Sequence, residues 1–190
     1  DMTGTPQILG EGGVRCGGQF FDAAVYKQIA SAMREAGTPL ARADKLADYQ
    51  ACRRLKETLS LENTATQIFS NGKSYTLDRA TFNELIRPML RLTLEACDNV
   101  VTTAGRKWSD IGQVLFVGGS TAIPLIKDML EPHLQSHNAS GVKVIRTMQG
   151  ANDSYNHLYA TCLGGITTKI GGPQRPPIGH VMQGSRKIQL

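Results

Sequence analysis

The sequence predicts an α/β protein, and three local patterns indicate this fold class. Residues 113–117 (QVLFV) form a short apolar run rich in β-branched and aromatic side chains, which is typical of a buried strand. Apolar positions recur at helical spacing in residues 19–36 and 79–104. Asn71-Gly72 separates two short segments of alternating polarity, which indicates a β-hairpin. The chain of 190 residues is long enough to bury one core with a smaller subdomain attached.

The composition narrows the classes of partner. The formal net charge is +5, the basic residues are dispersed, and aromatic residues make up only 6% of the chain. Because no glycine–aromatic RNA-binding signature is present, we expect no nucleic-acid partner. The four cysteines lie far apart, which predicts reduced thiols rather than a disulfide framework or a metal cluster. No apolar run reaches membrane-spanning length, so we expect no membrane partner and a soluble, cytoplasmic protein.

Two helical segments are predicted in the first part of the chain. The first follows the Gly-Gly turn at Gly17 and Gly18, and Gly37 and Pro39 end it, because both residue types stop helices. The second covers 40–60. Within it, Arg53 and Glu57 are four positions apart and share a face, so they can form an ion pair.

A long helix is predicted after the hairpin. Asp78 immediately precedes this helix and is a favourable N-cap residue, and Pro88 predicts a kink inside it. A further strand is predicted at 142–147. A short helix is predicted to start at Asp153 or Ser154.

The predicted central strand leads into a glycine turn and then a helix. Gly118 and Gly119 leave the turn without side chains, Ser120 or Thr121 is expected to cap the helix, and Pro124 falls in its first turn. Such a corner lets a ligand approach the main chain and directs the first helical N–H groups outward, which suits a nucleotide. Many strand–helix turns use glycine only for a tight bend, so the glycines alone do not establish a nucleotide site. No lysine follows them, so this is not the P-loop pattern.

Four segments, in this order, resemble the DnaK family of 70-kDa heat-shock chaperones: CGGQFFD (16–22), CRRLKETLS (52–60), LDRATFNELI (77–86) and VLFVGGSTAIPLIKDML (114–130). The resemblance implies lobe II of the nucleotide-binding domain of an actin-like ATPase, a ribonuclease H-like fold with an inserted helix–hairpin subdomain. On this basis we expect the core α/β subdomain at 1–37 and 81–168, the insertion at 38–80, and a flexible tail at 169–190 rich in Gly, Pro and basic residues.

The resemblance also implies a binding site for ATP or ADP with Mg²⁺, because lobe II forms the adenosine-facing wall of the nucleotide cleft in this family. Gly118, Gly119 and Ser120 match the loop that approaches the ribose and phosphates. Lys56 and Ser60 match positions on the helix that meets the adenosine. The earlier glycine turn, Gly17-Gly18, matches a turn near the cleft.

The sequence departs from the family pattern at the positions that the resemblance implies would contact the adenine. The family has Glu at the position of Arg53, and it has arginines that sandwich the adenine at the positions of Glu57 and Ala122. A guanidinium over a base contributes about 0.5–2 kcal/mol. Losing both therefore predicts nucleotide binding weaker by about one to three decades. Arg53, one turn before Glu57, remains a candidate contact to the base.

The leading hypothesis is a nucleotide-binding lobe II fragment of a divergent heat-shock-type chaperone. Its implied partners are lobe I of the same parent chain and, through the parent, nucleotide-exchange co-chaperones and unfolded clients. The parent is expected to be an ATPase, whereas this fragment holds no catalytic residue because the phosphate loop and catalytic lysine belong to lobe I. The alternative is a nucleotide-free protein-interaction module that retains the actin-like fold; the absent arginines favour it, and the retained Gly-Gly-Ser-Thr loop, Lys56 and Ser60 oppose it.

Two remaining groups are interpreted as structural. His133 and His137 have metal-ligand spacing, but no third ligand is near them in sequence, so we expect a solvated helix end and no metal site. Trp108 precedes the central strand and is expected to anchor packing.

Overall fold

The computed structural model describes residues 8–145, so the helix predicted from Asp153 or Ser154 and the tail at 169–190 lie outside the described residues. The described part is a mixed α/β structure, as predicted. Its helices are α1 (Gly18–Glu35), α2 (Lys45–Leu59), α3 (Arg79–Thr103) and α4 (Pro124–Ser136), and its strands are β1 (Thr64–Ile68), β2 (Ser74–Asp78), β3 (Gln113–Leu115) and β4 (Lys143–Ile145). Short 3₁₀ turns lie at Arg42–Asp44, Trp108–Asp110 and Gly119–Ala122.

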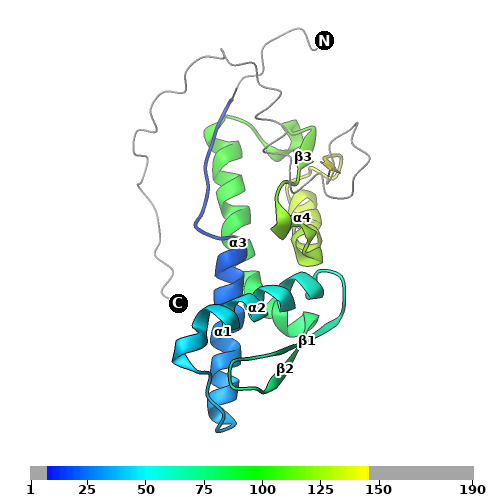
Figure 1. The fold of residues 1–190 in the computed structure, drawn as a ribbon. Coiled ribbons are helices and arrows are strands. Elements are labelled where there is room, and N and C mark those ends of the chain that lie inside the picture. The colour runs from blue at the N-terminus through cyan, green and yellow to red at the C-terminus, as the bar shows by residue number, and fades with distance from the viewer. Residues whose placement is uncertain (1–7, 146–190) are drawn as a thin grey trace, which may run out of the picture.

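The elements gather around the two ends of α3, which is the longest helix described (Figure 1). α1, α2 and the antiparallel β1–β2 hairpin lie at the end where α3 begins. α4 and the parallel β3–β4 pair lie at the other end. The hairpin register pairs Thr66 with Thr76, and the parallel pair matches Val114 with Val144.

The buried apolar residues form two clusters, and α3 packs against both. The first joins α1, α2, the hairpin and the beginning of α3 through side chains that include Val25, Leu55, Leu77 and Phe82. The second centres on Trp108, Phe116, Leu130 and Leu134, with Leu94, Cys97 and Val101 of α3 against it. Burying one such side chain contributes about 1.5–3 kcal/mol, so both clusters hold their elements on α3.

The hairpin loop is tied to α2 by a buried carboxylate. Asp48 of α2 is fully buried, and its two oxygens accept hydrogen bonds of 2.8 Å from the backbone N–H and the hydroxyl of Ser70. The Ser70 hydroxyl oxygen also accepts a 3.1 Å hydrogen bond from the backbone N–H of Ala41. The Asn-Gly signal correctly marked the hairpin, with Gly72 in the left-handed region at φ +74°.

The prediction for the start of α3 is confirmed. The Asp78 carboxylate accepts a 2.7 Å hydrogen bond from the backbone N–H of Thr81, and this bond holds the pKa of Asp78 below its ordinary value. The helix continues through Pro88 as far as Thr103.

Two predictions about β3 and the glycine turn that leads to α4 are wrong. Neither Ser120 nor Thr121 caps α4: the helix begins at Pro124, Ile123 is its N-cap, and a 3₁₀ turn precedes it. The cause is local, because the residue before a proline avoids helical geometry and Ile123 has φ −67° and ψ 120°. The strand predicted as buried is partly exposed, with Leu115 at 47% exposure, because the sheet described here pairs β3 only with β4.

The described cysteines are free thiols: Cys52 is buried, and Cys16 and Cys97 are half-buried. Burial raises the pKa of the Cys52 thiol to about 12, so it stays protonated at neutral pH. Cys162 lies outside the described residues. Among residues 8–145, no helix is both long and apolar enough to cross a membrane.

Candidate functional site

Three segments that are distant in the sequence meet at the first residue of α1. The Lys56 ammonium of α2 donates a 3.2 Å hydrogen bond to the carbonyl of Gly18. A Cβ added at Gly18 would lie 3.1 Å from Lys56 Nζ and 3.3 Å from Ser120 Oγ, so a side chain at this position would crowd both groups, which glycine leaves room for. We call Gly18, Lys56 and Ser120 the Gly18 corner. It joins one residue from each of the three sequence segments predicted to form the site.

The charge at the Gly18 corner is balanced by a carboxylate. Lys56 Nζ lies 2.8 Å from Asp22 Oδ1, and both side chains are only 11% exposed. Asp22 Oδ1 is buried and makes no hydrogen bond in the described part of the chain, so its contact with Lys56 is an ion pair. An ion pair this secluded from water is screened little, and its two members depend on each other.

The glycine turn after β3 has a conformation that only glycine adopts readily. Gly118 has φ +92° and ψ 157°. Its carbonyl accepts a 2.6 Å hydrogen bond from the Thr121 hydroxyl, which closes the turn. Gly119 opens the following 3₁₀ turn and is exposed, and Ser120 is half-buried. The turn therefore presents bare backbone at Gly119 next to a hydroxyl at Ser120.

The remaining predicted site residues have separate contacts. Gly17 is the N-cap of α1, and a Cβ added there would meet no atom within 4 Å. Ser60 follows α2, and its hydroxyl donates a 3.1 Å hydrogen bond to the carbonyl of Lys56, one turn earlier. The exposed Arg53 donates a 2.8 Å hydrogen bond to Glu57, which raises the pKa of Arg53, so the predicted ion pair is confirmed.

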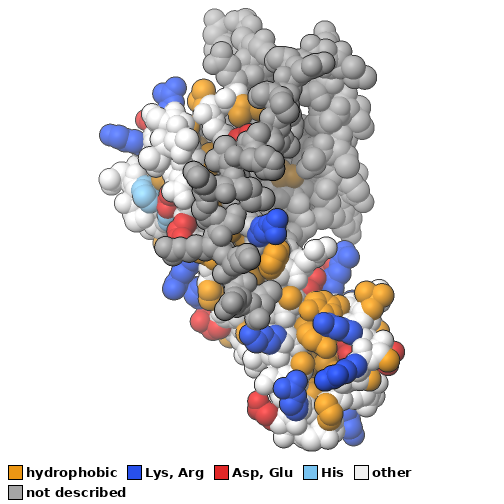
Figure 2. Space-filling view, turned by 90° about the vertical axis from the view of Figure 1, so that its left-hand side faces the viewer, with side chains coloured by type: hydrophobic (Ala, Val, Ile, Leu, Met, Phe, Trp, Pro, Cys, Tyr) orange, Lys and Arg blue, Asp and Glu red, His pale blue; other side chains and the backbone are white. Residues whose placement is uncertain are grey.

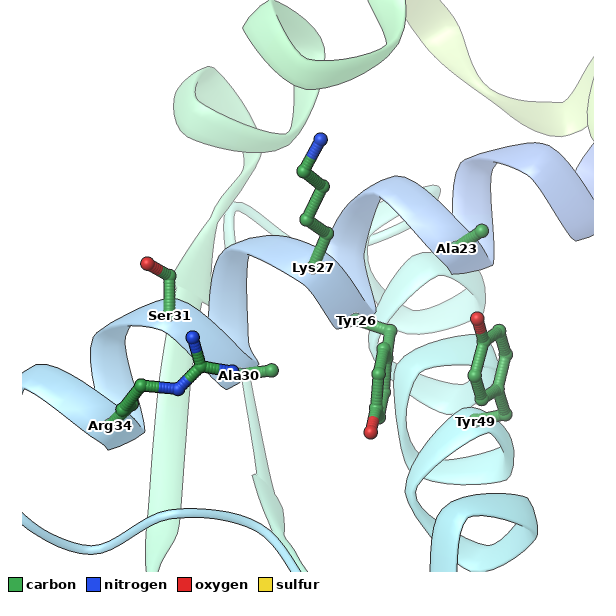
Figure 3. A pocket seen from close by; sticks show the side chains of 7 residues that line it. All are labelled: Ala23, Tyr26, Lys27, Ala30, Ser31, Arg34 and Tyr49. Atoms are coloured by element: carbon green, nitrogen blue, oxygen red, sulfur yellow. The ribbon is translucent and has the colours of Figure 1, made fainter. Parts of the chain in front are cut away.

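A concave surface lies between α1 and α2 and does not include the Gly18 corner. Its volume is about 440 Å³, and Figure 3 shows the side chains that line it, Ala23, Tyr26, Lys27, Ala30, Ser31, Arg34 and Tyr49. The Tyr26 and Tyr49 rings stack with their centroids 4.6 Å apart, and Lys45 Nζ is 5.8 Å from each centroid. Tyr26 and Tyr49 both line the hollow, so their stacked rings form part of its wall.

The comparison with known families identifies the class of protein. The family described as "Hsp70 protein" matches residues 8–144, and the chain belongs to this family. The membership predicted from the four segments is thereby confirmed, and it supports a nucleotide-binding fragment of an Hsp70-family chaperone.

Individual relatives are chaperones of the HscA type. The chain is 30% identical over 134 residues to the chaperone protein HscA homolog of Shewanella frigidimarina, covering 67% of this chain and 21% of that protein. It is 33% identical over 129 residues to the chaperone protein HscA of Cronobacter sakazakii, covering 66% of this chain and 20% of that protein. The chain thus spans about a fifth of the length of these relatives.

Proposed function

We propose that this chain is lobe II of an Hsp70-type nucleotide-binding domain and that the Gly18 corner faces the adenosine of ATP or ADP. In this proposal, residues 1–37 and 81–168 form the core subdomain, and 38–80 form the inserted helix–hairpin subdomain. The convergence of Gly18, Lys56 and Ser120 is the observation that supports it most strongly. A shared nucleotide pocket requires the three segments that carry these residues to meet. The helix and strand patterns of the sequence do not by themselves require that contact.

Each residue at the corner has a specific task in this proposal. The backbone at Gly18 and Gly119 lets the ribose approach without a clash, because neither residue carries a side chain. The Ser120 hydroxyl and the Lys56 ammonium supply polar contacts to the nucleoside and its first phosphate. Ser60 takes part after its hydroxyl turns away from the Lys56 carbonyl.

The residues at the corner do not form a Mg²⁺ site by themselves. Mg²⁺ prefers oxygen ligands such as carboxylates and phosphates. The carboxylate that contacts the corner, Asp22, is already paired with Lys56. We therefore assign Mg²⁺ in the parent protein to the nucleotide phosphates and lobe I, and this fragment alone is expected to bind nucleotide without hydrolysing it.

A second candidate function, a nucleotide-free docking module, is favoured by the adenine-facing positions. Arg53 is engaged with Glu57, and Ala122 has no cation to offer. Hydrophobic and basic side chains also share the surface at the end of the molecule that carries the hairpin (Figure 2), where Leu46, Leu61 and Ile68 are exposed. In this function lobe I, co-chaperones or clients would use the fold as a binding surface.

Calorimetric titration of the chain with ADP distinguishes the two functions. We expect heat of binding with a dissociation constant between micromolar and millimolar, since the adenine-stacking arginines are absent. Gly18→Val should weaken binding at least tenfold, because its side chain would fill the space between Lys56 and Ser120. Gly112→Val is the matched control, since an added Cβ there meets no atom within 4 Å and we expect unchanged affinity. Absence of binding at millimolar ADP, or equal affinity in both variants, would favour the docking module.

A further inference from the structure

A carboxylate from α3 and two histidines from the end of α4 converge at a place remote in sequence from the Gly18 corner. Asp98 Oδ1 lies 2.8 Å from His133 Nε2 and 3.9 Å from His137 Nε2. One ligand atom from each of the three residues can be chosen so that all lie within 4.8 Å of one another. The two histidines alone gave no third ligand in the sequence, because Asp98 is 35 positions away from His133.

The surrounding contacts hold the carboxylate in place. The indole N–H of Trp108 donates a 2.6 Å hydrogen bond to Asp98 Oδ1, and the Trp108 and His133 rings form a T-shaped pair with a centroid distance of 5.7 Å. Trp108 itself is buried in the second apolar cluster. Metal-binding carboxylates in proteins are commonly oriented by such a hydrogen bond from a neighbouring group.

Asp98 and His133 are half-buried and His137 is exposed, which leaves all three side chains reachable from solvent. Their exposed fractions are 18% for His133, 33% for Asp98 and 43% for His137. Asp98 and His137 border an open hollow of about 500 Å³, through which an ion and water can enter. In Figure 2 histidine side chains reach the surface in the half of the molecule away from the hairpin, next to acidic ones.

We propose that Asp98, His133 and His137 bind a divalent transition-metal ion of the zinc class, with water in the remaining position. Two imidazoles and one carboxylate suit Zn²⁺, whereas Mg²⁺ and Ca²⁺ prefer oxygen ligands only. Tetrahedral bonds of about 2.0–2.2 Å place ligand atoms about 3.3 Å apart. The observed separations of 2.8 and 3.9 Å lie on either side of that value, and all the ligand atoms lie within 4.8 Å of one another, so side-chain adjustments are needed to complete the site.

The positive charges around the site lower its affinity for a metal ion and influence which class of metal it binds. Arg106 and Lys107 line the same hollow, and their positive charges oppose a bare cation. Neutral imidazoles bind Zn²⁺ by coordination rather than by charge, so these two cations oppose a transition-metal ion less than they oppose Mg²⁺ or Ca²⁺. A metal here would join α3 to the end of α4 and raise the stability of the second apolar cluster.

The single tryptophan of the chain makes the test specific, because Trp108 lies against the proposed ligands. We expect Co²⁺ to quench tryptophan fluorescence with saturation at one ion per chain and to give the visible absorption of a tetrahedral N/O site. Competing Zn²⁺ should abolish that absorption, and Zn²⁺ alone should raise the thermal unfolding midpoint. No quenching and no visible band at millimolar Co²⁺ would overturn the proposal and leave a hydrogen-bonded network without metal.

Variants separate this site from other metal-binding groups in the chain. His137→Gln removes a half-exposed ligand whose contact with Asp98 is long, so we expect the fold to survive and the Co²⁺ affinity to fall at least tenfold. Glu131→Gln is the control, since it removes a half-exposed carboxylate of the same helix that is paired with Lys127, and it should leave fluorescence quenching unchanged. An unchanged affinity in His137→Gln, or an equal loss in Glu131→Gln, would assign the metal to other residues and contradict the proposal.

Discussion

Replacing Lys56 with methionine is expected to destabilise the folded chain by about 3–5 kcal/mol. The substitution removes the ammonium that lies 2.8 Å from Asp22. The Asp22 side chain is only 11% exposed, so its carboxylate would lose its positively charged partner in a place largely shielded from water. A methionine occupies nearly the same volume, so the loss reports on the charge rather than on a cavity. Chemical denaturation followed by circular dichroism measures the difference in the free energy of unfolding.

The matched control uses the same substitution at an exposed ion pair. Lys127 lies 3.1 Å from Glu131 on α4, and both side chains are about half exposed, at 49% and 51%. Lys127→Met should cost at most about 0.5 kcal/mol, since water screens that pair. If both variants lost equally little stability, the Lys56–Asp22 pair would not be a buried ion pair in solution.

Replacing Asp48 with alanine is expected to cost about 3 kcal/mol of stability, because two hydrogen bonds to a buried carboxylate are lost. The Ser70 backbone N–H and hydroxyl would lose an acceptor in a site where Asp48 is fully buried. Hydrogen exchange should then show the hairpin loop opening more often, because the link from α2 to the hairpin is broken.

An exposed aspartate at the start of the same helix provides the comparison for Asp48. Asp44 is the N-cap position of α2, and its side chain makes no capping hydrogen bond. Asp44→Ala should therefore cost about 0.5 kcal/mol or less, chiefly through the helix dipole. Equal losses in the two variants would show that burial and the contacts with Ser70 contribute nothing.

Elements whose determinants are local could be predicted from the sequence. The cap at Asp78, the hairpin around Asn71-Gly72 and the pair of Arg53 with Glu57 each depend on residues within a few positions of one another. Because each signal depends on neighbouring residues, it can be recognised in the sequence without knowledge of the tertiary contacts. Trp108 was likewise expected to be a packing anchor, and it is buried in the second cluster.

Predictions were wrong where two local rules compete or where burial depends on distant segments. At the glycine turn, the preference of Ser120 and Thr121 for the N-cap yields to the effect of Pro124 on Ile123, and the Thr121 hydroxyl bonds back to Gly118 instead. An apolar run such as β3 indicates a strand, but its burial depends on which strands and helices cover it.

The tertiary contacts of the two candidate sites needed the structure. Only the resemblance to a family linked Lys56 with the Gly118–Ser120 turn, since no periodic pattern relates residues 64 positions apart. Asp98 carries no sequence signal of its own on α3, and its position opposite His133 and His137 follows from the packing of α3 against α4.

Titration of ¹⁵N-labelled chain with ADP, followed by nuclear magnetic resonance, tests the proposed nucleotide site most directly. The account predicts concentration-dependent shifts of the backbone signals of Gly18, Gly119 and Ser120, and little change at His137 and in the hairpin. The contrary result is that ADP at millimolar concentration shifts none of the signals of Gly18, Gly119 and Ser120, or shifts chiefly those of the hairpin. Either outcome would show that the Gly18 corner is not a nucleotide site.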